Sequence, residues 1–436
     1  MQYTGNTLEN QWMPFTPNKH FKANPRLFTR AEGAYYTNHH GDQVLDAVSG
    51  LFCTNAGHGR REITEAVTRQ IQEMDFSPPF QYGHPGAFEL ARRVAALTPE
   101  GLNYVFFVNS GSEAVETALK ASLAYHRARG QAQRVRFVGR ERGYHGVNFG
   151  GMSVGGMVKN REAFGAGMPG VVHMRHTHIP ENRFVRGEGE HGADLAEDLQ
   201  RAVDLCGADN IAACIVEPIA ASTGCLVPPK GYLKRLREIC DKHDILLIFD
   251  EVICGFGRTG KAFGAHSFGV TPDIMTMAKG LTNAAIPMGA VAFKDKIYQT
   301  VTEATPGAAV EFFHGYTYSG HPVACAAGLA ALDIYKKEGL FERAAALSAP
   351  FLDAVFSLRD VGGVTDIRGY GMIAALDLAP AEKPGQRGNQ TMIEIFEAGV
   401  LTRVIGDTVL VAPPFIVEDR HIDQMATTLR KVLTRH

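Results

Sequence analysis

An acidic pair and a lysine follow two short apolar segments of this chain. The run ILLIF at 245–249 is short enough for a buried strand, and Asp250 and Glu251 follow it directly. A second apolar segment, 274–277, lies just before Lys279. Open α/β sheets bind ligands at the carboxyl ends of their strands, so we expect these groups to face one crevice. A lysine at the end of a buried stretch is costly unless its amine is neutral or covalently used.

One acid paired with one lysine suits pyridoxal 5'-phosphate. Lys279 would form a Schiff base with the aldehyde, and Asp250 would hold a proton on the pyridine nitrogen. A charge-assisted hydrogen bond of this kind is worth about 1.5–3 kcal/mol. The cationic ring could then accept electrons from a substrate carbanion. Taken alone, the two residues are also compatible with an unrelated surface aspartate and surface lysine.

A glycine-rich turn favours a different cofactor at first sight. Gly255–Gly260 reads G-x-G-x-x-G after a strand, as in dinucleotide-binding turns. Such a turn requires a helix that opens within the glycines, and an acid about 20 residues further on. The next residues, 261–273, contain more glycine, a proline and no helical apolar period. We therefore expect an irregular loop here, and a nicotinamide dehydrogenase is the alternative from another enzyme class.

The segment 104–113 has the pattern of an anion-binding turn. A short apolar strand at 104–108 runs into Asn109-Ser110-Gly111-Ser112-Glu113, and a helix follows as far as Gly130. Free backbone N–H groups and the helix dipole would both face this turn. An ordinary serine helix cap would look the same, so the residues leave phosphate binding and plain capping both open.

Two further strand ends carry polar or aromatic groups. The buried strand predicted at 211–216 ends on Glu217. Another strand at 135–138 leads to Gly143–Gly146, in which Tyr144 and His145 lie between glycines and could stack on a planar ring. Aromatic residues in such places are also common as core packing. The strands that end in Ser/Gly, Glu and Asp should converge on one edge of a mostly parallel sheet.

Composition narrows the class of protein. The 436 residues are 45% hydrophobic and carry a net charge of −2. A chain of this length is too long for a single hydrophobic core and should form two or more domains. It has no basic run and no apolar span of bilayer length, so we expect neither nucleic-acid nor membrane partners. Seven scattered cysteines without C-x-x-C spacing indicate reduced thiols in a cytoplasmic protein. The histidine run at 173–178 lacks a carboxylate in register, so no metal is expected.

From about residue 85 the chain alternates strand and helix, and its composition changes near residue 315. We predict an α/β fold, with residues 56–315 as the large cofactor-binding domain and 316–436 as a smaller α+β domain. Residues 1–55, which include a hairpin about His40-Gly41-Asp42, should join that smaller domain. The C-terminal part should include a helix at 347–358 with Pro350 in its first turn, and a polar loop at 379–389.

Several long motifs in the same order resemble the class III aminotransferases of PLP-dependent fold type I. The resemblance covers nearly the whole chain and is strongest to the ω-amino acid (β-alanine):pyruvate and amine:pyruvate transaminases. It is carried by YHGVN, VEP, FDEVICGFGRTG, AKGLTN, HGYTYSGHPVACAAGLAAL and VLTRVIGDT. This resemblance implies a large domain with a mostly parallel seven-stranded sheet flanked by helices, and a small domain built from both termini.

The resemblance also implies roles for individual residues. Lys279 would carry the cofactor and move the proton, and Asp250 would pair with the pyridine nitrogen. The other cofactor-binding residues would be Ser110, Gly111 and Ser112 at the phosphate, Tyr144 on the ring face, His145, Glu217, Val252, and Thr317 donated by a partner subunit. A homodimer with shared active sites, or a pair of such dimers, is implied.

Substrate preference is implied in the same way. Relatives that use 2-oxoglutarate carry an arginine just before the Ala412-Pro413-Pro414 turn, where this chain is apolar. Arg403 instead matches the movable carboxylate-binding arginine of the pyruvate-using enzymes, although pattern alone favours a surface arginine. Phe52 stands where these enzymes often have tryptophan, which leaves the size of the large pocket open. β-Alanine, taurine, 4-aminobutyrate, diamines and simple amines remain open as donors, as do aminomutase and decarboxylase chemistry.

Overall fold

A seven-stranded sheet forms the centre of the molecule, a computed structural model that describes residues 8–165 and 167–435. Its strand order is β4-β10-β9-β8-β7-β5-β6, and β10 alone among these runs antiparallel to its neighbours. The strands are β4 (Tyr104–Val108), β5 (Arg136–Arg140), β6 (Val171–Met174), β7 (Ile211–Val216), β8 (Leu246–Asp250), β9 (Ile274–Met277) and β10 (Gly289–Phe293).

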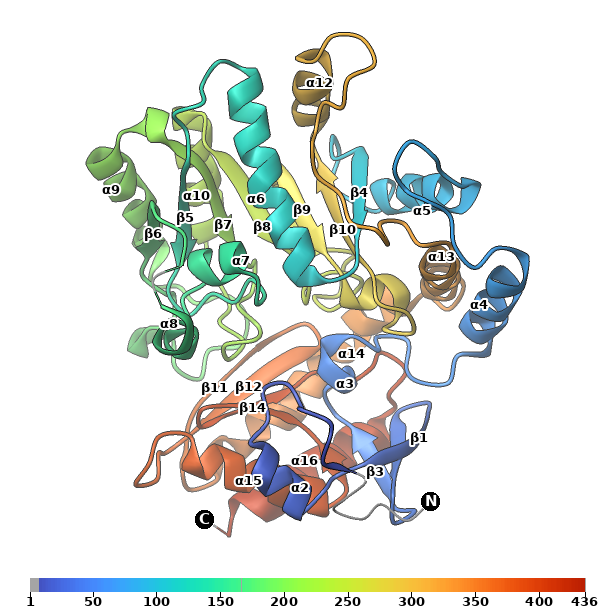
Figure 1. Cartoon of the computed structure of the whole chain (residues 1–436). Helices are drawn as coiled ribbons and strands as arrows, with labels where there is room; N and C mark the ends of the chain where they lie inside the picture. Colours follow the sequence, from blue (N-terminus) through green and yellow to red (C-terminus); the bar gives the residue numbers. More distant parts are fainter. Residues whose placement is uncertain (1–7, 166, 436) are drawn as a thin grey trace.

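Helices cover both faces of this sheet (Figure 1). Alternate residues of β8 divide between two cores: Leu247 and Phe249 pack with α10, whereas Leu246 and Ile248 pack with α6. Strands buried on both faces read as continuous apolar runs, which explains ILLIF. The helices are α4 (Arg61–Glu73), α5 (Pro85–Ala95), α6 (Gly111–Ala128), α7 (Phe149–Val154), α8 (Val158–Phe164), α9 (Glu197–Cys206), α10 (Tyr232–His243), α11 (Gly264–Phe268), α12 (Asp295–Glu303) and α13 (Pro322–Lys337).

Both chain ends contribute to a second body below the large sheet (Figure 1). One small sheet joins them directly, because β13 pairs in parallel with β3 in the order β1-β2-β3-β13. A second sheet has the order β11-β12-β15-β14. The strands are β1 (Phe28–Glu32), β2 (Tyr35–Asn38), β3 (Gln43–Asp46), β11 (Val364–Tyr370), β12 (Ile373–Leu378), β13 (Val400–Leu401), β14 (Arg403–Ile405) and β15 (Thr408–Val411).

The helices of this second body are α2 (Asn18–Ala23), α3 (Ser49–Phe52), α14 (Leu340–Phe356), α15 (Gln386–Glu397) and α16 (Asp419–Leu433). The domain boundaries predicted at residues 55 and 315 stay a prediction. The helix α13, which follows the second of them, packs against α4, α5 and the 3₁₀ turn η4 (Lys279–Thr282). Within the described residues, no helix has both the length and the apolar character needed to cross a bilayer.

Two predicted elements in the C-terminal part were wrong in their bounds. The helix expected from residue 347 begins at Leu340, so Pro350 lies inside α14 and not in its first turn. An interior proline removes one helical hydrogen bond, and burial of the apolar face, which includes Phe351 and Val355, offsets that loss. The loop expected at 379–389 ends earlier, because α15 begins at Gln386.

Candidate active site

A cavity of about 180 Å³ opens at the carboxyl edge of the large sheet. Because β4, β7 and β8 run in the same direction, the segments that follow them meet there, as the sequence predicted. The residues that line the cavity are Gly111, Ser112, Tyr144, His145, Gly146, Glu217, Ile219, Ser222, Asp250, Val252, Ile253, Ala278 and Lys279.

Asp250, the last residue of β8, is held in one orientation by its neighbours. Its Oδ1 accepts from the Thr276 hydroxyl at 3.1 Å and from the Val252 N–H at 3.2 Å. Its Oδ2 lies 2.8 Å from Nδ1 of His145. The carboxylate is 5% exposed and faces the cavity. A buried carboxylate fixed in this way can present a negative charge to a cationic ligand group.

Lys279 lies across the cavity at the start of η4 and adopts a left-handed φ of 48°. Its side chain is partly buried, and burial lowers the pKa of its amine, against the opposing effects of Cys53 and Asp250. The Nζ atom lies 5.8 Å from the centre of the Phe52 ring. A lysine with a lowered pKa is a better nucleophile and base near neutral pH.

Glu217 follows β7 and is a second acid of the cavity. Its Oε1 accepts from the Tyr144 N–H at 3.0 Å. Burial, followed by the nearby charge of Asp250, raises the pKa of Glu217 to about 7, while His145 opposes the shift. The two acids therefore differ in environment, because Asp250 accepts several hydrogen bonds and Glu217 is mainly desolvated.

The turn before α6 has the shape of an anion cradle. Ser110 caps the helix by accepting from the Glu113 N–H at 3.2 Å. Ser112 accepts from the Val147 N–H at 3.1 Å. Gly146 has a φ of 91°, and a Cβ there would lie 2.5 Å from Oγ of Ser112. Only glycine can approach Ser112 this closely, and the N-terminus of α6, where Ser112 lies, can bind an anion through its backbone N–H groups.

Four predicted residues lie outside the cavity lining. Thr317 is exposed in this chain, and its role in a partner subunit stays a prediction. Arg403, on β14, is partly buried and close enough to Tyr144 for the two groups to affect each other's pKa. Ser110 caps α6 behind the cavity. Phe52 is also absent from the lining, but its ring centre lies 5.8 Å from Nζ of Lys279 and it packs in one apolar cluster with the lining residues Ile219 and Ile253.

Several residues that line the cavity were not predicted from the sequence. Ile253 comes directly after the predicted Val252, so its place beyond a strand end was an available signal. Ile219 and Ser222 lie in the segment after β7, where no local pattern marks them. Their contribution depends on how that segment turns back over the sheet.

The glycine-rich turn lacks the helix that a dinucleotide-binding turn requires, and the histidine run contributes one residue to a charged cluster. Gly255–Gly260 consists of irregular turns, as predicted, and the next helix begins only at Gly264. In the histidine run, His178 lies near Asp366 and Asp377. The guanidinium of Arg368 stands among these groups, 2.7 and 2.8 Å from the two carboxylates, which makes the cluster an ion-pair network.

The donor set of the cavity fits pyridoxal 5'-phosphate. It offers a lysine with a lowered pKa, an oriented carboxylate, and a glycine-lined cradle at the N-terminus of an 18-residue helix. Among the described residues, Nε2 of His145 is buried without a hydrogen-bond partner. An unpaired buried polar atom on a cavity wall is typical of a site built for a polar ligand.

The fold and the site together define a PLP-dependent enzyme, and comparison of its sequence with known proteins identifies its family. The chain belongs to the class III aminotransferases, whose family model, described as aminotransferase class-III, matches residues 17–433. These enzymes depend on pyridoxal 5'-phosphate, which is therefore the cofactor of this protein.

Individual relatives agree with that placement. An omega-aminotransferase of Caulobacter vibrioides is 55% identical over 433 residues, which are 99% of this chain and 98% of the relative. A beta-alanine--pyruvate aminotransferase of Pseudomonas aeruginosa is 48% identical over 98% of this chain and 96% of its own length. The crystal structure of an omega transaminase from Pseudomonas jessenii in complex with PMP superposes with a TM-score of 0.94, at 32% identity, over 100% of this chain and 98% of that one.

Proposed function

We propose that this enzyme moves the amino group of an ω-amino acid, such as β-alanine, or of a primary amine to pyruvate, giving L-alanine and an aldehyde, ketone or semialdehyde. The observation that carries the proposal is that Lys279 and Asp250 line a single cavity, where the charge of Asp250 acts on the Lys279 amine. The donor and acceptor named for the similar Pseudomonas aeruginosa enzyme support the choice of substrates.

The roles of the residues follow from their places. When bound, the cofactor supplies a covalent link for the amino group and an electron sink. Lys279 would hold the cofactor and move a proton at Nζ, and Asp250 would keep a proton on the pyridine nitrogen. Gly111 and Ser112 would hold the phosphate, and Val252 and Tyr144, which line the same cavity, would contact the ring.

The polar wall of the site is completed by His145, which orients Asp250, and by Glu217, which fixes the Tyr144 main chain. Arg403 binds the carboxylate of pyruvate through its planar fork and withdraws for an uncharged amine. Its proximity to Tyr144 supports this role.

The test is alanine formation with pyruvate as acceptor across a panel of donors. We expect one alanine per donor consumed, a visible absorbance band from the lysine-bound cofactor, and loss of both in Lys279→Ala. Product without stoichiometric alanine would instead indicate an aminomutase or a decarboxylase. Preference for taurine, 4-aminobutyrate or a diamine would change the donor but keep the reaction.

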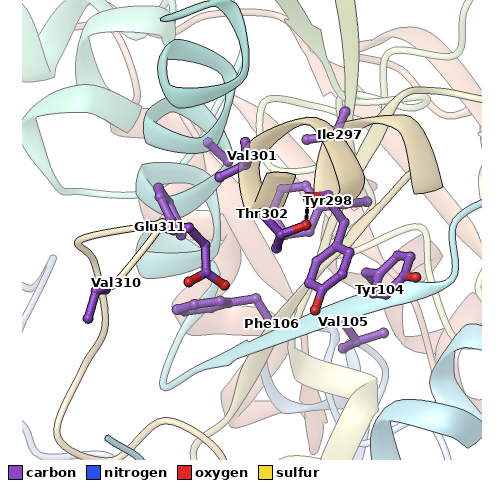
Figure 2. A pocket seen from close by; sticks show the side chains of 12 residues that line it. Tyr104, Val105, Phe106, Ile297, Tyr298, Val301, Thr302, Val310 and Glu311 are labelled. Carbon is purple, nitrogen blue, oxygen red and sulfur yellow. Dashed lines mark hydrogen bonds between the residues drawn. The ribbon is translucent and has the colours of Figure 1, made fainter. Parts of the chain in front are cut away.

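A homodimer with shared active sites, which could pair further into a tetramer, is part of the proposal. A second cavity, of about 280 Å³, lies between edge strand β4 and α12 (Figure 2). Its lining is mostly apolar and includes Tyr104 stacked on Tyr298 at 3.7 Å. Phe313, which follows the lining residue Phe312 in the chain, is 94% exposed, and Thr317 is also exposed. Apolar surface of this kind is typical of an interface between subunits.

Mixed dimers test whether Thr317 acts across that interface. Lys279→Ala and Thr317→Ala protomers, each impaired alone, should regain activity when subunits are exchanged, because one site of the mixed dimer is then intact. No recovery, despite exchange shown by mass, would contradict the shared site. A cytoplasmic location also belongs to the proposal, and the seven free cysteines support it.

A further inference from the structure

Arg258, in the glycine-rich turn between β8 and α11, is a cation buried in the centre of the molecule. Its side chain is 0% exposed, and burial lowers the pKa of the guanidinium to about 10. Within the described part of the chain, no carboxylate forms an ion pair with it at 4.0 Å or less. A buried charge costs several kcal/mol unless it is compensated, so neutral groups must hold this one.

The charge of the Arg258 guanidinium is compensated by four hydrogen bonds and by one aromatic ring. Nη1 donates to the carbonyl oxygens of Met372 at 3.1 Å and Pro413 at 2.8 Å. Nη2 donates to Oγ of Ser49 at 2.9 Å and to Oδ1 of Asn55 at 2.7 Å. The guanidinium also lies 4.7 Å from the centre of the Phe415 ring. One side chain therefore joins a large-domain turn, the turn between β11 and β12, the segment after β15, and segment 49–55.

Segment 49–55 has a backbone that needs such support. Ser49 and Phe52 are non-glycine residues with left-handed φ angles of 50° and 61°, and Gly50 between them has 64°. Residues in this region cost about 1–3 kcal/mol each and persist only where their surroundings determine them. Asp46 accepts from the Gly50 N–H at 2.7 Å, and Arg258 holds Ser49.

The other end of the segment is tied to the lysine turn. Oδ1 of Asn283 accepts from the Ala56 N–H, and its Nδ2 donates to the Gly57 carbonyl, both at 2.8 Å. Asn283 directly follows η4, which begins at Lys279. Phe52, 5% exposed, is thus held between two anchors with its ring 5.8 Å from the Lys279 amine.

Phe52 packs in one apolar cluster with Ile219 and Ile253, which line the cavity. We propose that Arg258 is a positioning residue that fixes Phe52 behind these lining residues, beside Lys279, and thereby limits the size of the amine donor that the pocket admits. The inference rests on the proposed amine transfer to pyruvate. Its chemistry requires the guanidinium fork: a lysine keeps the charge but cannot donate to Ser49, Asn55 and the two carbonyls in one plane.

The test compares the holoenzyme with Arg258→Lys and Ser49→Ala, using benzylamine and ethylamine as donors and pyruvate as acceptor. We expect the ratio of kcat/KM for benzylamine to that for ethylamine to rise about tenfold in Arg258→Lys and less in Ser49→Ala, since the wall becomes mobile. In a Phe52→Ala background the same Arg258→Lys change should alter the ratio by less than about twofold.

Alkylation of Cys53 by iodoacetamide, followed by peptide mass spectrometry, reports the mobility of the segment independently of activity. Cys53 Sγ contacts the Ser49 carbonyl at 3.4 Å and is partly buried, so it should react faster when Arg258 is replaced. Arg134→Lys is the matched control, because Arg134 is 3% exposed and donates mainly to carbonyls, including Ile211 at the opposite end of β7.

Arg134→Lys should lose thermal stability but keep the wild-type ratio of kcat/KM for the two amines and the wild-type rate of Cys53 alkylation. If Arg258→Lys and Ser49→Ala lower only the unfolding temperature, as Arg134→Lys does, the positioning role is wrong. If Arg258→Lys does not fold, Ser49→Ala decides alone. Failure of the proposed function is separate: the wild-type protein would then form no alanine from pyruvate with either amine.

Discussion

Nδ1 of His145 lies 2.8 Å from Oδ2 of Asp250, and both side chains are buried although 105 residues separate them. The contact leaves Oδ1 of Asp250 to accept from Thr276 and Val252. The carboxylate is therefore oriented before any ligand binds, and this preorganisation reduces the cost of stabilising charge during the reaction. The charge of this carboxylate should then matter more for turnover than its shape does.

Asp250→Asn should keep the cofactor bound but reduce kcat by at least about 100-fold, because a neutral partner no longer maintains a cationic ring. Absorbance of the bound cofactor and single-turnover rates with pyruvate measure the two effects. Glu251→Gln is the matched control: this adjacent buried acid accepts from the Gly264 and Ala265 N–H groups at 2.8 and 2.6 Å and does not line the cavity. Wild-type turnover in Asp250→Asn would refute the assignment.

Arg403→Ala should weaken the use of pyruvate more than the use of benzylamine. A charged hydrogen-bonding pair is worth about 1.5–3 kcal/mol, so kcat/KM for pyruvate should fall about 10- to 100-fold. Arg403→Lys keeps the charge but loses the guanidinium fork, so its kcat/KM for pyruvate should lie between the values of the wild type and Arg403→Ala. Steady-state kinetics with each substrate varied in turn provide the measurement. Equal losses for keto acid and amine would argue against a carboxylate-binding role.

Glu217→Gln should flatten the pH dependence of stability in the cofactor-free protein. Because the folded-state pKa of Glu217 is raised from 4.5 to about 7, the folded state binds the proton more tightly than the unfolded state. Stability therefore falls as pH rises from about 4.5 to 7, by about 3 kcal/mol for a shift of this size. Glu251, whose pKa is also raised to about 7, contributes with the same sign.

Urea unfolding at pH 5, 6, 7 and 8 measures this dependence. In Glu217→Gln the new amide oxygen can still accept from the Tyr144 N–H, so the native contact is retained while the titration is removed. In Glu217→Gln, the free energy of unfolding should decline with pH by about half as much as in the wild type. Glu73→Gln, on the exposed face of α4, should show the full wild-type decline. An unchanged slope in Glu217→Gln would show that this carboxyl group is not the source.

Gly146→Ala should weaken cofactor binding by at least about tenfold. The new Cβ would meet Ser112 Oγ at 2.5 Å, and alanine is strained at a φ of 91°. Gly41→Ala separates the two effects, because Gly41 has a φ of 93° but nothing within 4 Å of its added Cβ. Absorbance titration with pyridoxal 5'-phosphate should show a loss for position 146 alone, and equal affinities would contradict the cradle.

Much of the framework could be predicted from short stretches of sequence. The strands at 104–108 and 211–216 have the predicted bounds, because continuous apolar runs are properties of neighbouring residues. The same locality placed Asp250 and Glu217 at strand ends. Parallel strands then bring such ends to one edge of the sheet. The residues of the cavity could therefore be predicted from the sequence, whereas their arrangement could not.

Local pattern failed where packing between distant segments overrides it. Pro350 would normally mark the start of a helix, yet tertiary burial keeps it inside α14. No sequence pattern indicates that Arg258 contacts Ser49, 209 residues away, or that Phe52 is held in a left-handed conformation beside Lys279. The sequence alone determined which chemical groups the site contains. Only the tertiary structure decided their orientation and the wall that encloses them, because both depend on contacts that form when separate segments pack together.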